Sequence, residues 1–145
     1  LHTLRSADLR RDYGALAQTL TTFYAAVWLA KFALGNVVGE DATPRFYTAL
    51  TIALGRLQAK AEGTGGDAQV ESAALVGTPL AYLDEHGLLS DYANSATKRR
   101  RRQLLLDMAV GKRGVPALAA GDWQRLRQWV EALLHHAECH VPPMP

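Results

Sequence analysis

The sequence predicts an all-α protein, a single helical bundle that spans residues 1–145. Apolar residues recur mostly every three or four positions, and glycines and prolines separate the apolar segments. The composition, 48% hydrophobic and 21% charged, is typical of a globular domain. The single cysteine, Cys139, has no partner for an internal disulfide. We therefore expect an apolar core and a reducing, cytoplasmic environment.

A first helix is expected to begin near Ser6, whose hydroxyl can cap the first turn, and to stop at Gly35 and Asn36. Residues 16–34 form the longest apolar stretch, but the polar residues at 18–22 make it a poor membrane span. A buried bundle helix is the better interpretation. The aromatic residues of this region are assigned to the core: Phe23, Tyr24, Trp28, Phe32, Phe46 and Tyr47.

Turn residues divide the middle of the chain into further helices. Thr43 and Pro44 mark a helix start, because proline at the first helical position loses no hydrogen bond. That helix is expected to end before the glycine-rich residues 63–66. Within the next helical segment, Pro79 predicts a kink or a new start. Gly87 is the expected C-cap of this segment.

Residues 88–121 leave two interpretations open. They form either a small β-hairpin that turns at Gly111–Gly114, or a short helix followed by a loop. A last helix is expected over residues 122–137, which carry a helical stripe of apolar residues. The stripe consists of Trp123, Leu126, Trp129, Val130, Leu133 and Leu134.

Positive charge is concentrated in the last third of the chain. The formal net charge of +2 divides into about −3 over residues 1–97 and +5 over residues 98–145. Five cations are adjacent at Lys98–Arg102, here called the basic run, and phosphates of a polyanion would neutralise them with release of counterions. If residues 103–117 fold back as a hairpin, two further cations join them. The candidate nucleic-acid-binding residues are Lys98, Arg99, Arg100, Arg101, Arg102, Lys112 and Arg113. The alternative is a solvated loop that keeps the protein soluble.

A histidine-rich segment near the end of the chain is a weak candidate metal site. His136 and His140 are four residues apart, so that one helix would bring both rings to a zinc ion, with Cys139 nearby. The spacing does not match a standard zinc finger, and histidines near a helix C-terminus are also favoured by the helix dipole. We therefore expect no metal ion or other cofactor.

Catalytic motifs are absent from the sequence. It contains no nucleophile elbow, no phosphate-binding glycine loop with a lysine, and no HExxH motif. The acidic pairs Glu40-Asp41 and Asp84-Glu85 fall at expected helix ends, where carboxylates cap helices or remain solvated. We therefore expect a protein that is not an enzyme.

Several segments follow one another in the order known from the RecO family of DNA-repair and recombination mediators. They are Leu4–Tyr13 (LRSADLRRDY), Phe23–Phe32 (FYAAVWLAKF), the short Gly39-Glu40-Asp41 turn, Pro44–Leu50 (PRFYTAL) and Leu80–Leu89 (LAYLDEHGLL). Together they resemble the C-terminal helical domain of that family. The resemblance implies that residues 1–5 are the end of an upstream OB-fold domain.

The chain departs from the family at its zinc module. Many members carry four cysteines after the segment that ends at residue 89. Here the first pair would fall near residues 93–96 and the second after Gly111–Gly114, and neither pair is present. The resemblance therefore implies a degenerate zinc-module region within residues 88–121 and transfers no metal site.

The resemblance implies a cytoplasmic protein that binds single- and double-stranded DNA. It would anneal complementary strands and help load the recombinase onto coated single strands. A RecR-like protein and the single-stranded-DNA-binding protein would be its partners, with no role for a membrane. The main alternative is a standalone helical protein–protein interaction adaptor, with an apolar groove and a basic patch for acidic partners. A third interpretation is a helical enzyme subunit with a metal site at His136 and His140.

Overall fold

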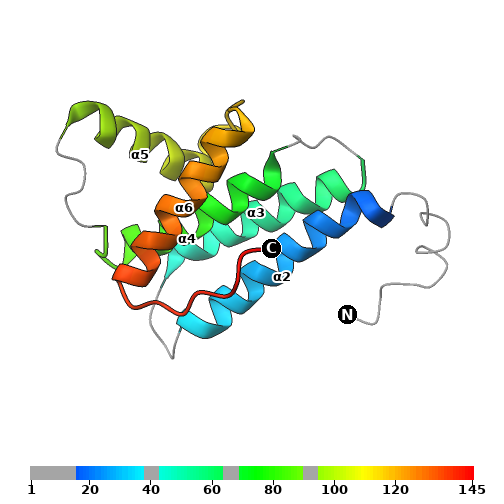
Figure 1. Ribbon diagram of the computed structural model, residues 1–145, viewed down its shortest axis with the longest axis horizontal. Helices are drawn as coiled ribbons and strands as arrows, with labels where there is room; N and C mark the ends of the chain where they lie inside the picture. Colours follow the sequence, from blue (N-terminus) through cyan, green and yellow to red (C-terminus); the bar gives the residue numbers. More distant parts are fainter. Residues whose placement is uncertain (1–15, 38–42, 64–68, 90–94) are drawn as a thin grey trace.

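Five α-helices make up the part of the chain that the computed structural model describes, residues 16–37, 43–63, 69–89 and 95–145 (Figure 1). They are α2 (Leu16–Asn36), α3 (Pro44–Ala61), α4 (Val70–Glu85), α5 (Ala96–Ala109) and α6 (Ala120–His136). No β-strand occurs in these residues, so the all-α prediction is confirmed. The expected helix start at Ser6 and the end of an upstream domain at residues 1–5 lie outside the described residues. None of the described helices combines the length and the hydropathy that a membrane crossing requires.

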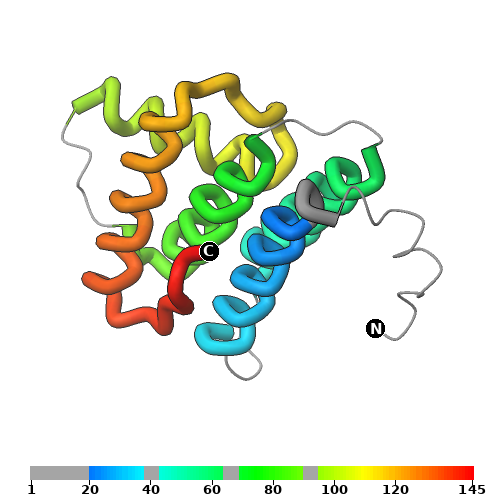
Figure 2. Tube along the Cα trace, turned by 45° about the vertical axis from the view of Figure 1, so that its right-hand side comes forward, coloured from blue at the N-terminus to red at the C-terminus, as the bar shows by residue number. Residues whose placement is uncertain are grey.

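Helix α4 lies at the centre of the bundle. Helices α2 and α3 pack on one side of it, and α5 and α6 pack on the other (Figure 2). Every residue from Ala73 to Leu83 is buried, including Pro79. The helix continues through this proline, so the predicted new start at Pro79 is wrong. A proline inside a helix costs about 3 kcal/mol, and burial of α4 on all sides outweighs that cost.

Aromatic rings join the first three described helices. Phe32 of α2 stacks on Trp28 with ring centroids 5.3 Å apart, and it meets Tyr82 of α4 edge to face at 5.4 Å. Phe46 of α3 packs against the rings of both Phe32 and Tyr82. The core assignment is therefore confirmed for Trp28, Phe32 and Phe46.

The same assignment is wrong for the other three aromatic residues. Phe23 is 58% exposed, Tyr24 is 51% exposed and Tyr47 is 66% exposed. Helix α2 is apolar around most of its circumference, so its sequence does not indicate which side faces the core.

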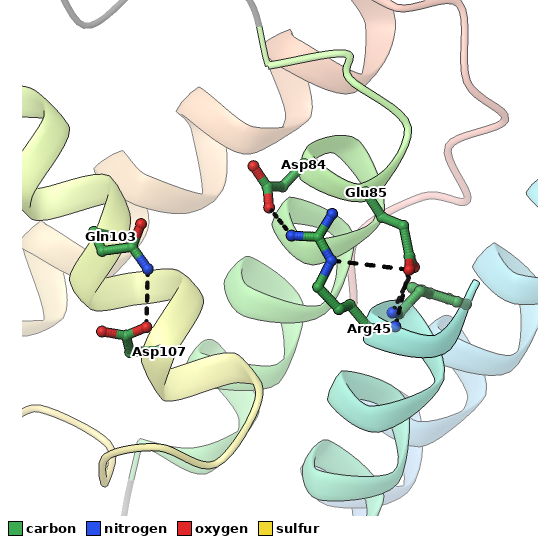
Figure 3. Close-up of polar contacts among 6 residues, drawn as sticks. Arg45, Asp84, Glu85, Gln103 and Asp107 are labelled. Atoms are coloured by element: carbon green, nitrogen blue, oxygen red, sulfur yellow. Dashed lines mark hydrogen bonds and ion pairs between the residues drawn. The ribbon is translucent and has the colours of Figure 1, made fainter. Parts of the chain in front are cut away.

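The start of α3 is confirmed at Thr43 and Pro44, but the cap comes from another helix. The Thr43 side chain makes no capping hydrogen bond. Instead, the Glu85 carboxylate at the end of α4 accepts hydrogen bonds from the backbone N–H groups of Arg45 (2.9 Å) and Phe46 (2.8 Å). The Arg45 guanidinium pairs with Asp84 at 2.8 Å and lies 3.9 Å from Glu85 (Figure 3). This acidic pair therefore fixes the end of α4 to the start of α3.

Two glycines end α4 and α5. Gly87 has φ of +66°, and its N–H donates to the Asp84 carbonyl while Leu88 N–H donates to the Leu83 carbonyl. The predicted C-cap is thus confirmed. Beyond it, residues 96–109 form α5 and a loop follows, in which Gly111 has φ of +83°. The helix-and-loop interpretation of residues 88–121 is therefore confirmed.

The β-hairpin interpretation of the same region is wrong. The Ser95 hydroxyl caps α5 by accepting the Lys98 backbone N–H at 3.2 Å. Leu105, Met108 and Ala109 then lie buried on one face at helical spacing. This cap and this apolar face together favour a helix over paired strands.

The C-terminal tail returns across α2 (Figure 1). Asn36 forms a double hydrogen bond with the His140 backbone, donating to its carbonyl at 2.7 Å and accepting from its N–H at 2.8 Å. The Trp28 indole N–H donates to the Pro142 carbonyl at 2.9 Å in a buried contact. Gly35 lies directly beneath the His140 ring, which a Cβ at this position would overlap.

Candidate nucleic-acid interface

Helix α5 has two halves with different surroundings. Its C-terminal half packs on α4, where Gly77 allows the Met108 methyl and the Ala109 Cβ to approach closely. Residues 95–104, here called the basic arm, extend away from the bundle (Figure 1). Every residue from Ser95 to Arg101 is exposed, as are Gln103 and Leu104. The protein thus presents about ten residues that contribute little to its core.

The basic arm carries the basic run. Lys98, Arg100 and Arg101 are exposed and Arg102 is half-buried, and none of the four forms an ion pair with another described residue. The nearest described carboxylate along the helix, Asp107, accepts a hydrogen bond from the Gln103 amide at 2.9 Å (Figure 3). The local positive charge is therefore not neutralised along the helix itself.

The position of the basic run within α5 strengthens the positive potential. Its residues occupy the first two turns of the helix, where the aligned peptide dipoles contribute about half a positive charge. Cations at this end are unfavourable for helix stability, while an anion that approaches it is attracted by side chains and backbone together. The arrangement suits a polyanion better than it suits an isolated helix.

Lys112 and Arg113 do not join the basic run. They are exposed in the loop beyond the C-terminal end of α5, and a helix rises about 1.5 Å per residue. About 15 Å of helix therefore separates Arg100 from the end of α5. The expectation of one patch depended on the hairpin and is wrong for this reason.

A second basic group forms around the loop after α5. The Arg113 carbonyl accepts a hydrogen bond from the Arg56 guanidinium of α3 at 3.0 Å, and burial lowers the pKa of Arg56. Arg56 was not predicted as a candidate, because nothing in its local sequence indicates proximity to residue 113. With Lys112 it gives the molecule a smaller cationic surface beside α3.

The histidine-rich segment does not have the geometry that a zinc site would need. Helix α6 ends at His136, Glu138 reverses the chain with φ of +60°, and His140 is held against α2 by Asn36. Within the described part of the chain, no group of three His, Cys, Asp or Glu side chains is placed to hold a metal ion. Burial raises the pKa of the Cys139 thiol, which disfavours the thiolate that binds metals. The spacing argument for His136 and His140 fails because no single helix contains both.

A second surface, on α2, was missed by the sequence interpretation. Residues facing away from the core recur in a 3-4-3-4 pattern, and we call them the α2 outer face: Leu20, Phe23, Val27, Ala30 and Leu34. Leu34 is 84% exposed. Beside this face, Tyr24, Lys31 and the prolines of the tail border a shallow hollow of about 400 Å³. The heptad-like spacing was present in the sequence, but the core pattern on the same helix obscured it.

Comparison of the chain with protein-family models, with curated proteins and with solved structures gives no match. The function is therefore argued from the residues and their placement.

Proposed function

We propose that the chain is a DNA-binding module without catalytic activity, which acts in the cytoplasm. The observation that carries this proposal is the basic arm, where five consecutive cations lie on helical turns that extend away from the bundle. Such a cluster weakens the isolated helix and gains from phosphates, whose neutralisation releases counterions. Lys98, Arg99, Arg100, Arg101 and Arg102 would make the main phosphate contacts, with Lys112 and Arg113 as a separate, smaller contact.

The resemblance to the RecO family supports a more specific role. We propose that the module aids annealing of single strands and loading of the recombinase in DNA repair and recombination. A RecR-like protein and the single-stranded-DNA-binding protein would be its partners. The helical fold agrees with this role, while the role itself still depends on the resemblance.

Fluorescence anisotropy with labelled single- and double-stranded DNA tests the proposal. A variant with all five residues of the basic run changed to Gln should bind at least about tenfold more weakly at moderate salt, since several phosphate contacts are lost. A Lys112→Gln/Arg113→Gln variant should lose about twofold to threefold. Circular dichroism should show the same helix content in each variant. Unchanged affinity of the five-residue variant would rule out the basic run as the DNA contact.

A control removes cations that lie elsewhere on the molecule. Arg125 and Arg127 of α6 are not part of the basic arm, and Arg125 already pairs with Asp122. An Arg125→Gln/Arg127→Gln variant should bind DNA nearly as the parent protein does. This control removes the same charge as the Lys112→Gln/Arg113→Gln variant, so an equal loss in these two would mean that net charge alone explains the contribution of Lys112 and Arg113.

The α2 outer face favours a second candidate function, a helical adaptor for protein partners. Its 3-4-3-4 spacing of apolar residues fits an amphipathic helix with the same spacing. Titration calorimetry with a purified RecR-like protein tests this. Phe23→Glu should abolish heat of binding if α2 is the contact, whereas the five-residue Gln variant of α5 should bind normally. If only the α5 variant loses binding, the partner protein contacts the basic arm and not α2.

A further inference from the structure

The basic arm is exposed at every residue except the half-buried Arg102, and its length is defined. Residues 95–104 rise about 15 Å along the helix axis at 1.5 Å per residue. Apart from the half-buried Arg102, each residue of this segment is exposed. Fully buried residues of α5 begin only at Leu105. Another molecule could therefore surround these turns.

The five cations point around the whole circumference of the helix. Successive residues are about 100° apart, so Lys98, Arg101 and Arg102 share one side while Arg99 and Arg100 lie on the opposite side. One strand of nucleic acid, or a flat anionic surface, lying along one side of the helix would contact only two or three of the five cations. Only a partner with phosphates on two facing walls would meet all five.

We infer that α5 enters the major groove of B-form double-stranded DNA through its basic arm. This inference rests on the proposed DNA-binding function and specifies its substrate. An α-helix with side chains is about 10–12 Å wide, and the B-DNA major groove is about 12 Å wide with phosphates on both sides. The major groove of A-form RNA is too narrow and deep for side chains to read. The arm thus selects duplex DNA over duplex RNA by shape.

The contact is made chiefly to phosphates and carries little sequence preference. Gln103, the one residue of the arm suited to pair with adenine, has its amide engaged by Asp107 at 2.9 Å. The remaining side chains long enough to cross the groove are the cations, which bind phosphate oxygens in any sequence and add at most a preference of arginine for guanine. Binding should therefore depend strongly on salt and weakly on sequence.

Three probes of one sequence test the inference: a duplex of DNA, a duplex of RNA and one DNA strand. Anisotropy titrations at several salt concentrations give the slope of log affinity against log salt. For five contacts on duplex DNA the slope should be about −4.5, and for two or three contacts on a single strand about −1.4 to −2.1. Duplex RNA should bind at least about tenfold more weakly than duplex DNA.

Two variants of equal charge provide the matched comparison. Lys98→Gln/Arg101→Gln removes one side of the helix and Arg99→Gln/Arg100→Gln removes the other. Insertion into a groove predicts that each pair reduces the steepness of the duplex slope by about 1.8. A one-sided contact predicts that one of the two pairs leaves the slope unchanged, and that result would overturn the inference.

Chemical footprinting locates the helix in the groove. Dimethyl sulfate methylates guanine N7 in the major groove and adenine N3 in the minor groove. Protection of N7 alone is expected, and protection of N3 alone or of neither atom would overturn the inference. Equal binding of duplex DNA and duplex RNA would also overturn it while leaving the basic run as a phosphate contact. Failure to bind any of the three probes would instead refute the proposed function.

Discussion

Helices α4 and α5 pack against each other, yet they differ in what their residues do. Helix α4 buries every residue from Ala73 to Leu83, whereas α5 buries only Leu105, Met108 and Ala109. Apolar burial is the main source of folding free energy, so α4 should dominate stability. The exposed Lys98, Arg100 and Arg101 of α5 add little to the core, and none of the three forms an ion pair with another described residue. The comparison shows that α4 supplies much of the core, whereas α5 leaves its cations on the surface, where the proposed DNA contact would be made.

The largest expected effect is truncation of a core residue in α4. Leu80 is fully buried, so Leu80→Ala should lower the free energy of unfolding by about 2–5 kcal/mol through lost burial and a cavity. The control in α5 is Leu104→Ala, because Leu104 is 43% exposed and its loss should change stability by no more than about 0.5 kcal/mol. Urea denaturation followed by circular dichroism measures both. Similar losses in the two variants would contradict the comparison.

The contact between the two helices should be sensitive to added volume. A Cβ at Gly77 would lie 2.9 Å from the Met108 methyl and 3.0 Å from the Ala109 Cβ. Gly77→Leu should therefore lower the free energy of unfolding by about 1–3 kcal/mol, because the larger side chain overpacks the contact between α4 and α5.

The control for Gly77 is a glycine of α3 with open space around it. A Cβ at Gly55 would meet no heavy atom of another residue within 4 Å, so Gly55→Ala should stabilise the protein by about 0.5–1 kcal/mol. Thermal unfolding compares the two changes. If Gly77→Leu is neutral while Gly55→Ala stabilises, α4 and α5 are not closely packed.

The end of α4 should have an intermediate effect through the cap of α3. Glu85→Ala removes the acceptor of two backbone N–H groups and should cost about 0.5–2 kcal/mol, the usual range for a lost N-cap. Asp84→Ala removes only the exposed ion pair with Arg45 and should cost at most about 1 kcal/mol. Denaturant titrations that rank Asp84→Ala above Glu85→Ala would refute the capping role.

The smallest effect on stability is expected in the basic arm. Arg100→Gln removes an exposed cation close to the positive end of the α5 dipole, so the free energy of unfolding should rise by up to about 0.5 kcal/mol. Affinity for duplex DNA should fall in the same variant. Thermal unfolding and anisotropy on one preparation measure both. A clear loss of stability would show that the arm supports the fold.

The sequence was sufficient where local chemistry decides the structure. Proline at a first helical position and glycine with positive φ at a C-cap act within a few residues, so Thr43, Pro44 and Gly87 were assigned correctly. The new start predicted at Pro79 was wrong because the effect of this proline depends on the packing of four other helices around α4. Tertiary burial therefore overrides the local rule.

The candidate site was predicted in part. The cluster of cations at Lys98–Arg102 is visible in the sequence, but its distance from Lys112 depends on whether the chain between them forms a helix or a hairpin. The exposure of Phe23 depends on which side of the apolar helix α2 the rest of the bundle covers. The choice of a helix could have been inferred from Ser95 and from the spacing of Leu105, Met108 and Ala109, whereas the covered side of α2 is set by the packing of the other helices.

The tail contacts also determine how long α2 lacks part of its cover during synthesis. The bonds of Trp28 to Pro142 and of Asn36 to His140 join residues 114 and 104 positions apart. At translation rates of about 5–20 residues per second, α2 waits on the order of ten seconds for the segment that covers Trp28. The indole N–H of Trp28 gains its carbonyl partner only when residue 142 has been added. Closure of the tail over α2 therefore cannot be completed before residue 142 has been synthesised.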